Sequence, residues 1–161
     1  MDLGRYQPPM GIRDYICRMQ KTMKTVLKDE YGIESVPSDD TGVFLNETTK
    51  VGSIGVQVRH RLTSHGFAFN VTREPLSWFN QVVACGLANV KAECMENAMG
   101  EPITVSEVIP PLVEAFGKIY GKDMEEMNPE REGEIGELIR EVEDEALAMG
   151  EWTKEPLING P

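Results

Sequence analysis

The sequence contains few cysteines, few histidines and no long apolar run. Its three cysteines are too few and too scattered for a disulfide framework, and their spacings fit no zinc motif. We therefore expect a reducing compartment and no metal site. No stretch approaches the roughly 20 apolar residues of a membrane-spanning helix. The first residues also lack the apolar core of a signal peptide. We expect neither membrane insertion nor a secretory leader.

Basic residues are scarce at the C-terminal end of the chain. Residues 122–161 contain 13 acidic and 4 basic side chains, so only −2 of the net charge of −11 belongs to residues 1–121. Nucleic acids are bound through clustered lysine and arginine side chains, so we expect no nucleic-acid partner. The same contrast predicts a main domain over residues 1–121 and an acidic helical extension over residues 122–161.

Apolar residues recur at helical spacing over residues 10–31, which predicts a helix that ends at Gly32. The opposite face of this helix is basic. It carries Arg13, Arg18, Lys21, Lys24 and Lys28. A face of this kind offers an acidic partner a place to bind.

Two further helices are predicted toward the C-terminus. Thr104 and Glu107 have the spacing of a capping box. The pair Pro110-Pro111 interrupts the pattern, so the helix is expected to run from one of these prolines to about Tyr120. Asn128-Pro129 is typical of a helix start, and an acidic helix is expected from there to about Met149.

Between the first two helices the residues favour strands. Three segments, 42–45, 51–58 and 66–71, are rich in β-branched and aromatic residues and are punctuated by glycine. Residues 59–65 are polar and are expected to connect the last two of these strands. Residues 77–100 are expected to be irregular. Three successive strands indicate a hairpin or meander within an α/β (α+β) fold.

Cys85, Lys50 and His65 are the side chains most able to carry chemistry. Cys85 follows an apolar run and precedes a glycine, which would let a substrate approach the backbone closely. The alternative is that Cys85 is a small buried apolar residue without a chemical role. Lys50 heads a glycine-rich strand and could lower a thiol pKa from a cleft, or it could be a solvated strand-end lysine. His65 could be a general base, although a lone histidine is more often structural.

Several ordered segments of the chain closely resemble the lipoyl(octanoyl) transferase family. They are Gly42-Val43-Phe44, Lys50 to Val56, Thr63 to Val71, and Ala84-Cys85-Gly86-Leu87. The opening residues, to about Tyr15, are similar to the family as well, and the resemblance extends to about residue 120. It implies the mixed sheet with flanking helices of the biotin/lipoate ligase-like fold.

The resemblance implies that an octanoyl group passes from acyl carrier protein to a lysine of a lipoyl domain. The acceptors would be lipoyl domains of 2-oxoacid dehydrogenase complexes or the H protein of glycine cleavage, and no cofactor is implied. The acyl-accepting cysteine falls on Cys85 and its partner lysine on Lys50. Two substrate-lining stretches fall on Ser53-Ile54-Gly55 and on His65-Gly66-Phe67-Ala68.

Members of this family carry an Arg-Gly-Gly…His-Gly-Pro-Gly-Gln loop upstream of the segment that matches the opening residues, so the printed chain is expected to begin after that loop. The location implied is mitochondrial in a eukaryote and cytoplasmic in a bacterium. Two other readings stay open. One is a non-catalytic relative that binds the same partners. The other is a lipoate ligase, which is disfavoured because ligases form an adenylate and need no acyl-accepting cysteine.

Overall fold

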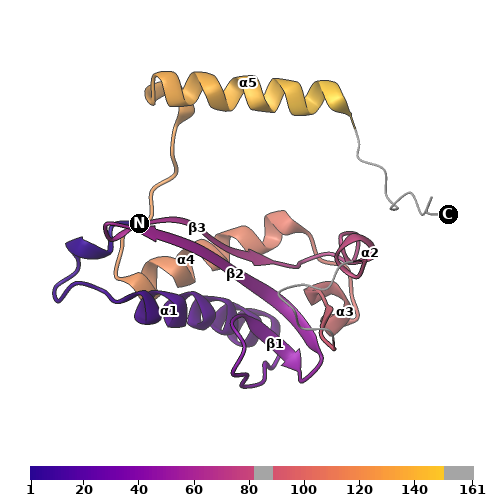
Figure 1. The fold of residues 1–161 in the computed structure, drawn as a ribbon. Coiled ribbons are helices and arrows are strands. Elements are labelled where there is room, and N and C mark those ends of the chain that lie inside the picture. Colours follow the sequence, from indigo (N-terminus) through magenta and orange to yellow (C-terminus); the bar gives the residue numbers. More distant parts are fainter. Residues whose placement is uncertain (82–88, 151–161) are drawn as a thin grey trace. The chain divides into compact units, whose positions relative to one another are not determined.

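The computed structural model describes residues 1–81 and 89–150. The chain forms two compact units, Met1–Asp123 and Met124–Pro161. In the described part of the first unit a four-stranded sheet is flanked by helices (Figure 1). Among the described residues, no helix is long and apolar enough to span a membrane.

The sheet is mixed, as expected. Strands β1 (Val43–Asn46), β2 (Thr49–Arg59) and β3 (Leu62–Phe69) form an antiparallel meander. The short β4 (Lys91–Ala92) pairs in parallel with the start of β2. All three predicted strands are therefore confirmed. Figure 1 shows β2 and β3 as a long hairpin that extends beyond β1.

The turn between β2 and β3 is tighter than the sequence suggested. Only His60 and Arg61 lie between the strands, and both have positive φ angles, of 49° and 66°. Positive φ at both central positions is typical of a type I′ turn, which normally contains Asn-Gly. The prediction of a connection over residues 59–65 was wrong, because neither turn residue is a glycine or an asparagine. His65 consequently lies inside β3 and not at its start.

The first helix is confirmed. Helix α1 (Ile12–Thr25) continues into a wider turn, η2 (Val26–Glu30), and Gly32 adopts a left-handed φ of +64° just beyond it. Tyr15, Met19 and Met23 on its apolar side are buried against the sheet and against α4 (Val105–Tyr120), whereas Ile12 at its start is exposed. The helical period thus placed the core face correctly.

Helix α4 begins earlier than predicted. Thr104 caps it, its hydroxyl and the Glu107 carboxylate forming a complete capping box, and Pro110 and Pro111 lie inside the helix. Proline at position 111 removes the amide that would bond the carbonyl of Glu107. The hydroxyl of Tyr31 donates a hydrogen bond to that carbonyl instead, at 3.2 Å. A tertiary contact therefore replaces a bond that the helix cannot make.

Residues 77–100 are less irregular than predicted in their described parts. They include most of α2 (Leu76–Phe79), β4, and α3 (Met95–Met99), which ends at Gly100 in a left-handed conformation. The amide of Met95 donates to the carbonyl of Asn70, which fixes the start of α3 at the end of β3. Elements this short give little periodic signal in a sequence.

The second unit contains a short turn, η4 (Pro129–Arg131), and α5 (Glu134–Met149). Asn128 caps η4 and not α5, because Gly133, with φ 55° and ψ −128°, separates the two. The predicted start at Asn128-Pro129 was therefore early, while the predicted end at Met149 is confirmed. Apolar side chains of α5, such as those of Leu138 and Val142, are exposed.

Candidate active site

A β-bulge determines which way Lys50 faces. Val43 pairs with Gly52 and Phe44 pairs with Lys50, so Val51 is an extra residue on β2. Val51 is fully buried in the core, and a side chain at Gly52 would point at Met23 in the same core. Val51 and Gly52 thus both face the core. Lys50 and Ser53, which flank them, therefore lie on the same side of β2 and line one cavity there. Bulges of this kind re-aim side chains and are frequent beside active sites.

The ammonium group of Lys50 is held away from bulk solvent. Lys50 is only 8% exposed, and its Nζ donates a hydrogen bond of 2.8 Å to the carbonyl of Thr41. The same atom lies 5.4 Å from the centre of the Phe44 ring, within cation–π range. No described carboxylate lies within ion-pair distance of it. The solvated strand-end alternative for Lys50 is therefore wrong.

The cavity that Lys50 lines is small, about 70 Å³, and lies beside the start of β2. Ser53 and Ala68 contribute to its wall, and they are direct partners across the β2–β3 pair. Lys91 is a second basic residue that lines this cavity, and it is exposed to solvent. The remaining lining residues are Asn70, Phe79, Val90 and Ala92. A cation beside small side chains suits a substrate that develops negative charge.

Cys85 lies outside the described residues, which exclude 82–88. Phe79 and Val90 stand on either side of that segment in the sequence, and both line the Lys50 cavity. The other two thiols differ from each other. Cys94 is completely buried, and burial raises the pKa of its thiol. Cys17 is exposed on α1.

The remaining residues of the two expected substrate stretches are spread along the hairpin. Ile54 and Phe67 pair with each other and pack against the core. Gly55 pairs with Gly66, and a side chain added at Gly55 would meet open space. His65 is exposed and pairs with Val56, six residues beyond Lys50 and hence about 20 Å along the strand. The structure brings Ser53 and Ala68 to Lys50, but not His65.

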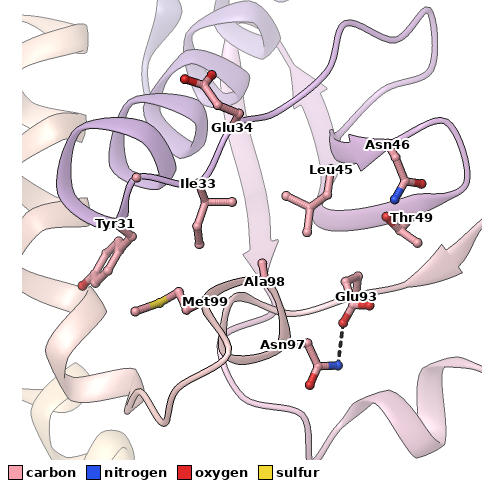
Figure 2. A pocket seen from close by; sticks show the side chains of 11 residues that line it. Tyr31, Ile33, Glu34, Leu45, Asn46, Thr49, Glu93, Asn97, Ala98 and Met99 are labelled. Atoms are coloured by element: carbon pink, nitrogen blue, oxygen red, sulfur yellow. Dashed lines mark hydrogen bonds between the residues drawn. The ribbon is translucent and has the colours of Figure 1, made fainter.

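A larger cavity, of about 610 Å³, lies next to Thr49 and contains no cation among its lining residues. Figure 2 shows its side chains, including the hydrogen bond from the Asn97 amide to Glu93. Its other carboxylate, on Glu34, pairs with Lys28. Thr49 and Lys50 are adjacent on β2 but line different cavities. Among the described residues, no group of three or more His, Cys, Asp or Glu side chains could hold a metal ion.

Sequence reasoning missed the groups that hold Lys50. The Thr41 carbonyl is a backbone atom, which residue type does not reveal. Gly42 has a φ of +137°, and a side chain there would collide with the Lys50 stem and lie 2.6 Å from the Gly52 carbonyl oxygen. The glycine between Thr41 and Val43 was the one signal available.

Arg18, which the sequence placed on a basic solvent face, is partly buried. Its Nη1 donates to the carbonyl of Ile119 at 2.7 Å, and its guanidinium lies about 6 Å from the rings of Tyr6 and Tyr120. A cation at the C-terminus of α4 is favourable to the helix dipole. The Tyr120 hydroxyl donates to the carbonyl of Tyr15, and burial raises the pKa of Tyr120. Arg18 therefore fastens α1 to α4.

Comparison with protein families gives a match over most of the first unit. A family model described as lipoyl protein ligase A/B catalytic domain matches residues 3–117. An octanoyltransferase of Koribacter versatilis is 34% identical over 122 residues, which are 74% of this chain and 48% of that protein. A mitochondrial octanoyl-[acyl-carrier-protein]:protein N-octanoyltransferase of Danio rerio is 31% identical over 116 residues, 72% of this chain and 50% of that protein. The chain thus spans about half the length of the curated relatives it matches.

A solved structure shares the fold. The biotin protein ligase of Aquifex aeolicus in complex with biotin and ATP superposes with a TM-score of 0.56 at 11% identity. The match covers 75% of this chain and 47% of the ligase. At this identity the likeness shows the fold alone, and it confirms the expected biotin/lipoate ligase-like arrangement.

Proposed function

Because the chain belongs to the lipoyl protein ligase A/B catalytic domain family, we propose that it carries the catalytic portion of an octanoyltransferase. In this proposal the chain takes an octanoyl group from acyl carrier protein as a thioester on Cys85. It then transfers the group to a lysine amine of a lipoyl domain. The names of the relatives at about 30% identity support octanoyl transfer over ligation.

The chemistry divides into two exchanges. The Cys85 thiolate attacks the carbonyl carbon of the donor thioester, and the carrier thiolate leaves and takes up a proton. The acceptor amine then attacks the Cys85 thioester, an amide forms, the cysteine leaves as thiolate, and the amine gives up a proton. Lys50 would stabilise the thiolate as an ammonium and relay the proton in the second exchange.

The environment of Lys50 is the observation that carries the proposal. A lysine so deeply buried, without a described carboxylate partner, keeps N–H groups available to an anionic partner in its cavity. Ser53 and Ala68 would form the wall beside the reacting acyl group, because their short side chains leave the backbone accessible. Gly55, Gly66 and the neighbouring positions of the hairpin would extend that wall.

The proposed partners follow from the same relatives. Their names imply an octanoyl-acyl carrier protein as donor and a protein as acceptor. We propose as acceptors the lipoyl domains of 2-oxoacid dehydrogenase complexes or the glycine cleavage H protein. The proposed location is mitochondrial for a eukaryotic chain, in line with the name of the Danio rerio relative, and cytoplasmic for a bacterial one.

The test is transfer between purified proteins. The chain is mixed with octanoyl-acyl carrier protein and a lipoyl domain without ATP, and intact masses are followed over time. The wild-type chain is expected to acquire one octanoyl group and pass it to the domain. Cys85→Ser should acquire none, and Lys50→Met should acquire and transfer it far more slowly.

The exposed Cys17 is replaced by serine in all variants, so that labelling at Cys85 is read without interference. Octanoyl found on Cys94, or transfer that requires ATP, would refute the proposal. A stable complex with the lipoyl domain, without transfer by any variant, would favour the non-catalytic reading.

A further inference from the structure

The turn that precedes β1 is built around Lys50. The Thr41 carbonyl accepts the hydrogen bond from the Lys50 ammonium, and Gly42 lies directly over the lysine stem. A Cβ at Gly42 would meet the Lys50 Cε and would lie 3.0 Å from its Nζ. The position of the lysine head group therefore depends on where residues 41 and 42 lie.

A side chain of α1 fixes this turn from the other side. The amide Nε2 of Gln20 donates a hydrogen bond of 2.9 Å to the carbonyl of Gly42, in a partly buried setting. Gln20 comes from a helix 22 residues earlier in the chain, and that helix is itself buried against the sheet along its apolar side. The successive carbonyls of Thr41 and Gly42 thus bind Lys50 and Gln20, respectively.

We propose that Gln20 is a positioning residue for Lys50, acting through the Thr41-Gly42 turn. The importance of Lys50 for transfer rests on the proposed function, but its placement by Gln20 does not. A lysine side chain has four rotatable bonds and loses much rotamer freedom when it is held. The Thr41 carbonyl orients the ammonium only if the turn that carries it is immobile. The hydrogen bond from Gln20 to the neighbouring Gly42 carbonyl restrains that turn.

Removal of the Gln20 amide should therefore release Lys50 before it unfolds the chain. In Gln20→Met, a side chain of similar length no longer donates, and the Gly42 carbonyl loses its described partner. Loss of one hydrogen bond should increase the population with a displaced turn about fivefold. Gln57→Met is the matched control, since Gln57 is an exposed glutamine on β2, the strand of Lys50, and its amide oxygen accepts a hydrogen bond from the Ser64 hydroxyl.

The readout is the reactivity of the Lys50 amine. The folded chain is exposed briefly to N-hydroxysuccinimidyl acetate, and acetylation of Lys50 is quantified by peptide mass spectrometry against the exposed Lys21. We expect acetylation of Lys50 to rise about fivefold in Gln20→Met and to stay at the wild-type level in Gln57→Met. Alkylation of the buried Cys94 reports global unfolding and should not change.

Activity provides the second readout. If Lys50 acts in the reaction, Gln20→Met should lower kcat about fivefold while KM for the donor stays within about twofold, because docking does not use Lys50. Gly42→Ala, which pushes on the lysine directly, should also raise Lys50 acetylation. If Gly42→Ala fails to fold, the Gln20→Met result decides alone.

Two results would overturn the proposal. The first is unchanged Lys50 acetylation in Gln20→Met. The second is a parallel rise at Lys50 and Cys94, which would make Gln20 merely structural. Full transfer by Lys50→Met would refute the role of Lys50 in the proposed function, yet the acetylation result would still decide whether Gln20 positions it.

Discussion

At the scale of single residues, Lys50 occupies an environment that proteins usually give to apolar side chains. Its ammonium has one carbonyl acceptor and one aromatic ring as described neighbours, instead of a carboxylate. A carboxylate would neutralise the lysine, whereas a carbonyl orients it and leaves its charge available to a substrate or nucleophile. This arrangement favours a chemical role for the lysine over a structural one.

The first prediction concerns the reactivity of Cys85. If Lys50 stabilises the Cys85 thiolate, Lys50→Met should shift the pH profile of its alkylation upward, toward the ordinary thiol midpoint of about 8.5. Iodoacetamide modification is measured against pH in a Cys17→Ser background. Alkylation of the buried Cys94 reports unfolding and should stay low in both proteins. Coincident profiles for the wild type and Lys50→Met would contradict the pairing.

At the scale of secondary-structure elements, the residue types at the hairpin turn disfavour the conformation found there, whereas those at the start of α4 favour it. His60 and Arg61 adopt left-handed conformations that their side chains disfavour. Thr104 and Glu107 form the cap that their residue types favour. Each element therefore offers a stability test that does not depend on function.

The second prediction is that a favourable turn sequence stabilises the hairpin. The double variant His60→Asn/Arg61→Gly removes the steric cost of two left-handed residues and should raise the free energy of unfolding by about 1 kcal/mol. Thermal unfolding would register this as a gain of a few degrees. An unchanged or lower Tm would mean that contacts of Arg61, which packs near Gly4, outweigh the relief of strain.

The third prediction concerns pH and the cap of α4. Hydrogen bonds from the Thr104 hydroxyl and amide lower the pKa of Glu107 below its ordinary value. A lowered carboxyl pKa contributes stability that is present above the unfolded-state pKa, about 4.3, and is lost as pH falls through the folded-state value. The wild type should thus exceed Glu107→Gln in Tm at neutral pH. The difference should shrink as the pH falls below about 4, and a constant difference would contradict the assignment.

At the scale of the whole molecule, charge is distributed unevenly. The chain carries a net charge of −11, yet Arg13 and Lys21 are exposed on α1, and Arg59 and Arg61 are exposed at the hairpin turn. The proposed partners, acyl carrier protein and lipoyl domains, are generally acidic. In this proposal they should approach one of these two local patches.

The fourth prediction follows from those patches and rests on the proposed function. Charge reversal at Arg13 and Lys21 together, or at Arg59 and Arg61 together, should raise KM about fivefold with little change in kcat. Arg18 is left intact, because it binds the end of α4 and its loss would destabilise the fold. Added salt should weaken docking of the wild type more than that of the affected variant. Unchanged KM in both double variants would exclude both patches.

The sequence by itself determined the helix at α1, the three strands and the identity of Lys50 as a residue of interest. Helical spacing and runs of β-branched residues are local properties, and burial of the α1 apolar face followed from them directly. The resemblance supplied the family and the fold, which the comparisons confirmed.

Only the tertiary structure decided how Lys50 is placed. The bulge at Val51 turns it into its cavity, and that bulge arises from pairing with β1, which alternation along β2 alone does not show. Likewise, α4 continues through two prolines. The Glu107 carbonyl, which has no amide partner in the helix, accepts a hydrogen bond from Tyr31, 76 residues earlier in the chain. Lys50 is covered by the Thr41-Gly42 turn, and a side chain of α1 holds that turn in place. Contacts between distant residues determine the solvation and direction of a charged group, and residue type cannot encode them.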